Sequence, residues 1–259
     1  MASNERRPIM AGNWKMHHTH LDAIQVVQKL SYRLEDRDYK ECEIVVCPSF
    51  TALRSVQTVL EADRIPILLG AQNAHWKDQG AFTGEVSPPM LAKLNVRYVI
   101  VGHSERRQLF GETDEQVNLK HKAVIKHEMT PIVCVGETLE EREAGRTDER
   151  VDSQTRAAFA GVRSGAAAAS VVAYEPIWAI GTGHNATPED ANATIAVIRA
   201  ALRDIYNAET AAGIRILYGG SVKPGNIADL MAMPEIDGGL VGGASLDPDE
   251  FARVVRFRV

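Results

Sequence analysis

The sequence predicts an α/β protein, a single-domain closed (β/α)8 barrel of eight parallel strands over residues 1–259. Short apolar or β-branched runs recur eight times, and the segments between them are long enough for crossover helices. Strand and helix alternation implies a parallel sheet. The repeats follow one another at roughly 30 residues without a proline- or serine-rich linker, which favours a closed barrel over a doubly wound sheet.

The expected strands are too short to be typical helices and rich enough in apolar residues to be buried. They cover residues 8–12, 43–47, 66–70, 97–102, 131–136, 171–174, 214–219 and 239–242.

Helical periodicity is clearest in residues 21–34, 113–126, 150–160 and 188–205. Thr187 followed by Pro188 is typical of a helix start, and Thr113 with Gln116 forms a capping box. The connections at residues 71–89 and after the sixth strand are longer than usual, and long loops on this face of a barrel often carry function.

The composition is that of a globular protein, with 45% hydrophobic and 24% charged residues. A net charge of -5 and a pI near 5.9 argue against a broad surface for nucleic acid or anionic membrane. Because the chain is negatively charged overall, an anionic ligand would have to be held by positive groups close to its binding site.

Neither the cysteines nor the N-terminus indicates export. The three cysteines lack metal-ligand spacing and are an odd number for a disulfide framework. The first ten residues lack the apolar stretch of an export signal, and no window is long enough to span a membrane. We expect a cytoplasmic protein.

Glu175 is a candidate general base, because it directly follows the sixth strand, where barrels place their chemistry. Pro176, Trp178 and Ile180 follow it in a glycine-flanked segment that could close as a lid. Cover by Trp178 and Ile180 is expected to desolvate Glu175 and raise its pKa. The alternative is an ordinary glutamate at a strand end.

Two further strand ends carry candidates. Lys15 could stabilise a phosphate or an oxyanion, although a lone lysine is more often a solvated surface charge. His103 lies at a predicted helix N-terminus, where the helix dipole disfavours the imidazolium, although a capping or packing histidine is the alternative. We expect Glu105 to lie near Lys15, and Arg106 and Arg107 to be structural.

Three glycine-rich segments could present backbone amides to a phosphate: residues 181–183, 219–221 and 242–245. Loops after the seventh and eighth strands of a barrel commonly bind phosphate.

These motifs together resemble the triosephosphate isomerase family, whose fold is the TIM barrel, over essentially the whole chain. The resemblance rests on residues 12–16 (GNWKM), 101–107 (VGHSERR), 173–183 (AYEPIWAIGTG), 218–222 (YGGSV) and 241–246 (VGGASL). His17 with His18, Trp76, and His184 with Asn185 depart mildly from the family pattern.

The resemblance implies interconversion of dihydroxyacetone phosphate and D-glyceraldehyde 3-phosphate in glycolysis and gluconeogenesis, without a metal or organic cofactor. Glu175 would move the proton between carbons, neutral His103 would polarise the carbonyl, and Lys15 with Asn13 would stabilise and orient the intermediate. The implied phosphate ligands are the amides of Gly181, Ser221, Gly242 and Gly243. The implied supporting residues are Glu105, Tyr218, Cys134, Glu137 and Trp178, with Tyr218 and Ser221 latching the closed lid and packing an equal alternative for Cys134.

Residues 80–85, which include Thr83, match the family's interdigitating loop, so a homodimer is expected. The expected ligand is a small triose phosphate, with no nucleic acid or membrane partner. Two alternatives stay open: an isomerase of a four-carbon ketose phosphate, and a catalytically silent barrel that serves as a binding protein.

Overall fold

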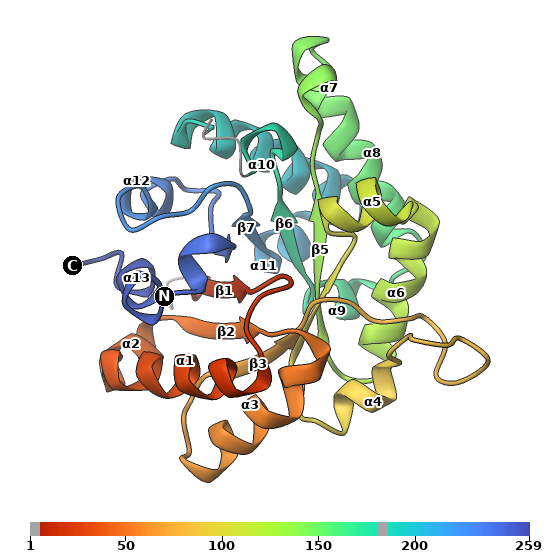
Figure 1. Cartoon of the computed structure of the whole chain (residues 1–259). Helices are drawn as coiled ribbons and strands as arrows, with labels where there is room; N and C mark the ends of the chain where they lie inside the picture. The colour runs from red at the N-terminus through yellow and green to blue at the C-terminus, as the bar shows by residue number, and fades with distance from the viewer. Residues whose placement is uncertain (1–5, 181–185) are drawn as a thin grey trace.

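A computed structural model describes residues 6–180 and 186–259, and it confirms the predicted (β/α)8 barrel (Figure 1). Eight parallel strands close in sequence order, and β1 pairs with both β2 and β8. The strands are β1 (Ile9–Asn13), β2 (Glu43–Cys47), β3 (Leu68–Ala71), β4 (Tyr98–Val101), β5 (Thr130–Val135), β6 (Val171–Tyr174), β7 (Arg215–Tyr218) and β8 (Gly238–Val241).

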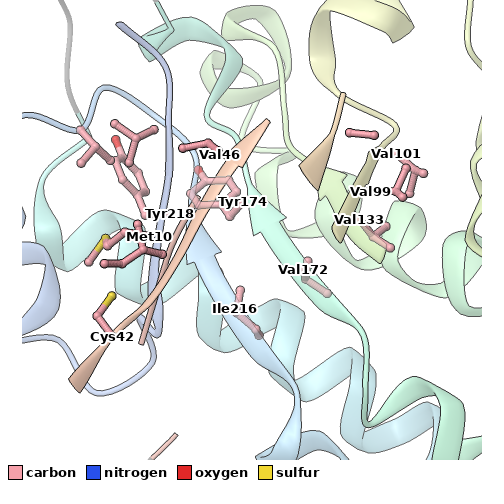
Figure 2. Packing of buried hydrophobic residues seen from close by; sticks show 14 of the residues in the cluster. Met10, Cys42, Val46, Val99, Val101, Val133, Val172, Tyr174, Ile216 and Tyr218 are labelled. Atoms are coloured by element: carbon pink, nitrogen blue, oxygen red, sulfur yellow. The ribbon is translucent and has the colours of Figure 1, made fainter. Parts of the chain in front are cut away.

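Alternation along the strands separates two apolar layers. One set of side chains fills the barrel interior, including Ile9 and Ala11 of β1 and Val171 and Ala173 of β6. The intervening residues pack in the layer that includes the helices, and Figure 2 shows several of them, such as Val172. A residue two positions beyond an inward-facing one therefore continues into the mouth of the barrel.

The helices surround the strands (Figure 1). They are α1 (His20–Arg33), α2 (Asp36–Glu41), α3 (Phe50–Ala62), α4 (Pro88–Ala92), α5 (Ser104–Phe110), α6 (Asp114–Lys126), α7 (Leu139–Glu143), α8 (Thr147–Phe159), α9 (Ser164–Ala167), α10 (Pro188–Ile205), α11 (Ala208–Gly213), α12 (Ile227–Met231) and α13 (Pro248–Val255), with short 3-10 turns η1 (Ile177–Ala179) and η2 (Gly243–Ser245).

The predicted helix starts are confirmed at two positions. Thr187 caps α10 by accepting the amide of Asp190, with Pro188 in the first turn. Thr113 and Gln116 form the reciprocal capping box of α6. α8 begins at Thr147, before the predicted residue 150, because acidic residues in its first turn complement the helix dipole.

The connection between β3 and α4 projects from the barrel (Figure 1). His75 is buried between the rings of Trp76 and Phe82, each with its centroid 4.2 Å away. Asp78 joins the loop to Lys126 and His127 at the end of α6. This loop is therefore held by ring stacking, by the ion pair with Lys126 and by the hydrogen bond with His127. Within the described part of the chain, none of the helices is both long and apolar enough to span a membrane.

Candidate active site

A cavity of about 350 Å³ opens at the carboxyl ends of the strands. Its lining combines residues at or just beyond the carboxyl ends of five different strands: Asn13, Lys15, His103, Glu175, Ser221 and Gly242. Asn13, Lys15, His103, Glu175, Ser221, Gly242 and Gly243, seven of the predicted site residues, thus share one cavity.

Glu175 enters the cavity because it continues the inward register of Val171 and Ala173. The close packing of Gly219 confines it from the β7 side: a Cβ added to Gly219 would lie 2.9 Å from Cγ of Glu175. Glu175 is only 2% exposed. A buried carboxylate has to be compensated by polar partners.

His103 and Ser104 provide those partners. Nε2 of His103 lies 2.9 Å from Oε1 of Glu175. The backbone amide of Ser104 donates to Oε2 at 3.0 Å, and its hydroxyl donates to Oε1 at 3.4 Å. Ser104 was not predicted as a site residue, although it lies inside the motif around His103.

His103 is the N-cap of α5, and this position determines its tautomer. Its Nδ1 accepts the backbone amide of Glu105 at 3.2 Å, so Nδ1 carries no proton and Nε2 is the donor. The preceding Gly102 has φ +71°, a backbone conformation that suits glycine and turns the chain from β4 into the helix.

Two influences on the pKa of His103 oppose each other. Burial disfavours the imidazolium, but the carboxylate of Glu175 outweighs it and holds the pKa of His103 above its ordinary value. The amide of Glu105 acts against protonation at Nδ1, because that bond would be lost. Separation of His103 from Glu175 would therefore favour the neutral ring.

The predicted rise in the pKa of Glu175 is wrong for this arrangement. Burial does raise it, but His103 and the amide of Ser104 stabilise the carboxylate and bring the pKa below its ordinary value. Trp178, the first of the two residues predicted to cover Glu175, donates its indole N–H to Glu137 at 2.8 Å. Ile180 does line the cavity with Glu175.

Lys15 is held by three contacts. Its backbone has φ +51°, a strained conformation for lysine, and its amide donates to Oδ1 of Asn13 at 3.0 Å. Gln72 donates to the carbonyl of Lys15 at 2.7 Å. Nζ of Lys15 lies 2.6 Å from Oε1 of Glu105, as expected from the sequence. Gln72, which no strand-end pattern indicated, acts as a backbone support.

Comparisons with known proteins agree with this geometry. Residues 8–258 match the family model described as triosephosphate isomerase. Triosephosphate isomerase of Moorella thermoacetica is 57% identical over 252 residues, which cover 97% of this chain and 99% of the relative. That of Streptomyces coelicolor is 54% identical over 253 residues, with 98% of each chain covered.

The chain belongs to the triosephosphate isomerase family. It is therefore an isomerase, and the expected resemblance is confirmed.

The amides expected to bind phosphate in this family member lie together where the structure describes them. Ser221, Gly242 and Gly243 line the same cavity as Lys223, which was not predicted. Gly181, with the rest of residues 181–185, lies outside the described residues. The predicted latch between Tyr218, Ser221 and the lid falls partly on that segment.

Glu137 is the common hydrogen-bond acceptor of a group of supporting residues. It is fully buried and accepts the hydroxyl of Tyr174 at 3.1 Å and the indole of Trp178. Burial is the main reason that the pKa of Glu137 lies above its ordinary value. The guanidinium of Arg142 stacks over the ring of Trp178 at 4.4 Å. Tyr218 is buried next to this group, with its ring centroid 6.4 Å from that of Tyr174.

Cys134 lies against the base and does not only pack. Its thiol is fully buried, and contact with Glu175 adds to burial in raising the pKa of Cys134 well above its ordinary value. The thiol is therefore protonated and can donate to the carboxylate.

A buried ion network supports the strand that carries His103. Glu112 accepts the amide of Gly102 at 2.9 Å and pairs with Arg106 at 2.7 Å and Lys120 at 2.6 Å. Arg107 pairs with Asp114, so both arginines are structural, as expected. Glu112 escaped prediction because nothing in its local sequence distinguishes it from a solvated glutamate. Over residues 6–180 and 186–259, there is no group of histidine, cysteine and acidic side chains that could hold a metal ion.

Proposed function

We propose that this cavity interconverts dihydroxyacetone phosphate and D-glyceraldehyde 3-phosphate in glycolysis and gluconeogenesis, with Glu175 as the base that moves a proton between adjacent carbons. The main support for this proposal is the distance of 2.9 Å between Nε2 of His103 and Oε1 of Glu175. The proton of the His103 ring lies on Nε2, because Nδ1 accepts a backbone amide. Proton abstraction beside a carbonyl requires such a pair, a carboxylate to take the proton from carbon and an N–H donor for the carbonyl oxygen.

Substrate entry separates the pair. The carboxylate then loses the contact with His103 that lowers its pKa, while burial, which raises it, remains. Glu175 becomes a stronger base where it faces the carbon. His103 turns its Nε2 proton to the carbonyl oxygen and transfers protons between the two oxygens of the enediolate.

Lys15 carries the positive charge that stabilises the enediolate and the phosphate, and Asn13 orients it. The amides of Gly181, Ser221, Gly242 and Gly243 bind the phosphate. Closure of the segment that follows Glu175 excludes water from the enediolate, and Tyr218 and Ser221 latch the closed segment.

We also propose that the chain is one domain, acts in the cytoplasm and forms a homodimer. Thr83 and Phe82 are exposed at the tip of the projecting loop, and Met16, next to Lys15, is 95% exposed. An exposed apolar residue beside a catalytic one fits a surface that a partner subunit covers. Sedimentation of the variant Thr83→Asp tests this, and an unchanged dimer, or a monomeric parent chain, would contradict it.

The decisive experiment compares isomerisation of D-glyceraldehyde 3-phosphate with that of a four-carbon ketose phosphate. We expect a large preference for the triose. Preference for the four-carbon sugar would overturn the assignment of the triose phosphate as substrate. Inactivity toward both sugars would favour the alternative of a catalytically silent barrel that serves as a binding protein.

The base is tested by Glu175→Gln, which removes the proton acceptor and keeps the shape. We expect turnover to fall by roughly a thousandfold or more, with far-ultraviolet circular dichroism and inhibition by inorganic phosphate retained. Turnover within tenfold of that of the parent chain would show that Glu175 is not the base.

A further inference from the structure

Lys223 is a charged residue of the cavity to which the proposed chemistry assigns no part. It lies on the loop between β7 and α12 and lines the same cavity as Lys15, Glu175 and Ser221. Its side chain is exposed and, within the described residues, forms no ion pair or hydrogen bond. Its ammonium group is therefore available to a ligand.

The charges of the cavity give this ammonium a role. Lys15 is paired with Glu105, and Glu175 adds a second carboxylate. His103 aside, Lys15 and these two carboxylates sum to one negative charge, and the whole chain has a net charge of -5. A further cation at the mouth would offset this negative charge and attract a phosphate dianion.

The loop presents Lys223 at a fixed place. Oδ1 of Asn226 accepts the backbone amide of Lys223 at 2.8 Å, and Nδ2 of Asn226 donates to the carbonyl of Ser221 at 2.8 Å. Asn226 thus links the backbone of Lys223 to that of Ser221, another residue of the cavity lining. The flexible stem keeps the ammonium hydrated, which suits attraction at a distance more than contact in the transition state.

We propose that Lys223 is a further substrate-binding residue that attracts and holds the phosphate dianion at the mouth of the cavity. It acts on the capture of substrate and not on the proton transfers, so it determines kcat/KM more than kcat. This inference rests on the proposed isomerase function.

The test compares Lys223→Gln and Lys223→Arg with the parent chain, and uses Lys40→Gln as a matched control. Lys40 is an exposed lysine on α2, which does not line the cavity, so this control removes the same net charge. Steady-state kinetics with D-glyceraldehyde 3-phosphate are measured from about 10 to 300 mM ionic strength at pH 8, where the phosphate is a dianion. Inhibition by inorganic phosphate is measured alongside.

For Lys223→Gln at low ionic strength we expect kcat/KM to fall by about three- to tenfold and kcat to stay within twofold. The dependence on salt should flatten, and inorganic phosphate should inhibit more weakly by a similar factor. Lys223→Arg should restore both values, and Lys40→Gln should match the parent chain.

Two results would overturn the proposal: Lys223→Gln indistinguishable from Lys40→Gln in kcat/KM and its salt dependence, or a loss confined to kcat. Failure of the isomerase function would be recognised separately, since the parent chain itself would then lack activity.

Discussion

The ammonium nitrogen of Lys15 lies 2.6 Å from a carboxylate oxygen of Glu105. The pair joins the end of β1 to the first turn of α5, the helix that His103 caps. Lys15 also has a left-handed backbone, with φ +51°. The ion pair therefore fixes the side chain of Lys15, whose backbone is strained, and links Lys15 to the helix turn that His103 caps.

Replacement of Glu105 by Gln should mainly affect catalysis. Lys15 keeps its charge but loses the partner that positions it, so we expect kcat/KM to fall roughly ten- to a hundredfold. The free energy of unfolding should change by less than about 1 kcal/mol, because both side chains are partly exposed. Steady-state kinetics and urea unfolding measure the two effects.

Glu115→Gln is the matched control for Glu105→Gln, because Glu115 is an exposed glutamate on α6. It should leave both quantities unchanged. Equal kinetics for the two variants would show that Glu105 does not position Lys15.

The strand register, and with it the position of Glu175, was predictable from local pattern. A run of β-branched residues alternates between two apolar layers, so the residue after Tyr174 had to enter the mouth of the barrel. The caps at Thr113 and Thr187 were predictable for the same reason, since each depends on neighbours within four residues.

Contacts between distant residues were mostly not predictable from local pattern, although Lys15 and Glu105, which follow two strand ends, were expected to meet. The pKa of Glu175 depends on a histidine and an amide that lie more than 70 residues away, and the sequence pattern carries only its burial. The burial of Glu112 depends likewise on its ion pair with Lys120. Glutamate and lysine usually lie on the surface, so neither residue alone indicates a buried pair.

Replacement of either Glu112 or Lys120 alone should destabilise the fold strongly. Both side chains are at most 5% exposed, and Lys120 also donates to Asn73 at 2.8 Å. Glu112→Gln would leave a buried ammonium without its counter-charge, so we expect a loss of about 3–5 kcal/mol in the free energy of unfolding. Urea denaturation at one protein concentration measures it.

The double variant Glu112→Gln with Lys120→Met should recover part of that loss, because the uncompensated charge is removed with its partner. A loss below about 1 kcal/mol in the single variant would contradict the assignment of a tightly coupled pair.

His121 should make the fold sensitive to acid. Its Nδ1 donates to the carbonyl of Ala158 and its Nε2 faces the hydroxyl of Ser170, both at 2.9 Å. Burial lowers the pKa of His121 from 6.5 to about 4. The unfolded chain therefore binds the proton first, and stability falls as the pH drops from 6.5 toward 4.

From pH 7 to pH 5 this residue should cost about 2 kcal/mol in the free energy of unfolding. His121→Gln lacks the titrating group, so the stability difference between the variant and the parent chain should narrow by that amount over the same interval. Denaturant titrations at pH 7, 6 and 5 measure it, and a constant difference would show that His121 titrates normally.

Gly219 should be required for the position of Glu175. A Cβ at Gly219 would lie 2.9 Å from Cγ of Glu175 and 3.1 Å from the carbonyl oxygen of Tyr174, so Gly219→Ala must displace the carboxylate or the end of β6. We expect kcat to fall roughly tenfold to a hundredfold, because a displacement of about 1 Å is enough to misplace a base. Gly225→Ala, in the same loop, is the control, since its Cβ would meet nothing within 4 Å. If both alanine variants kept the turnover of the parent chain, Glu175 would not need its close contact with β7.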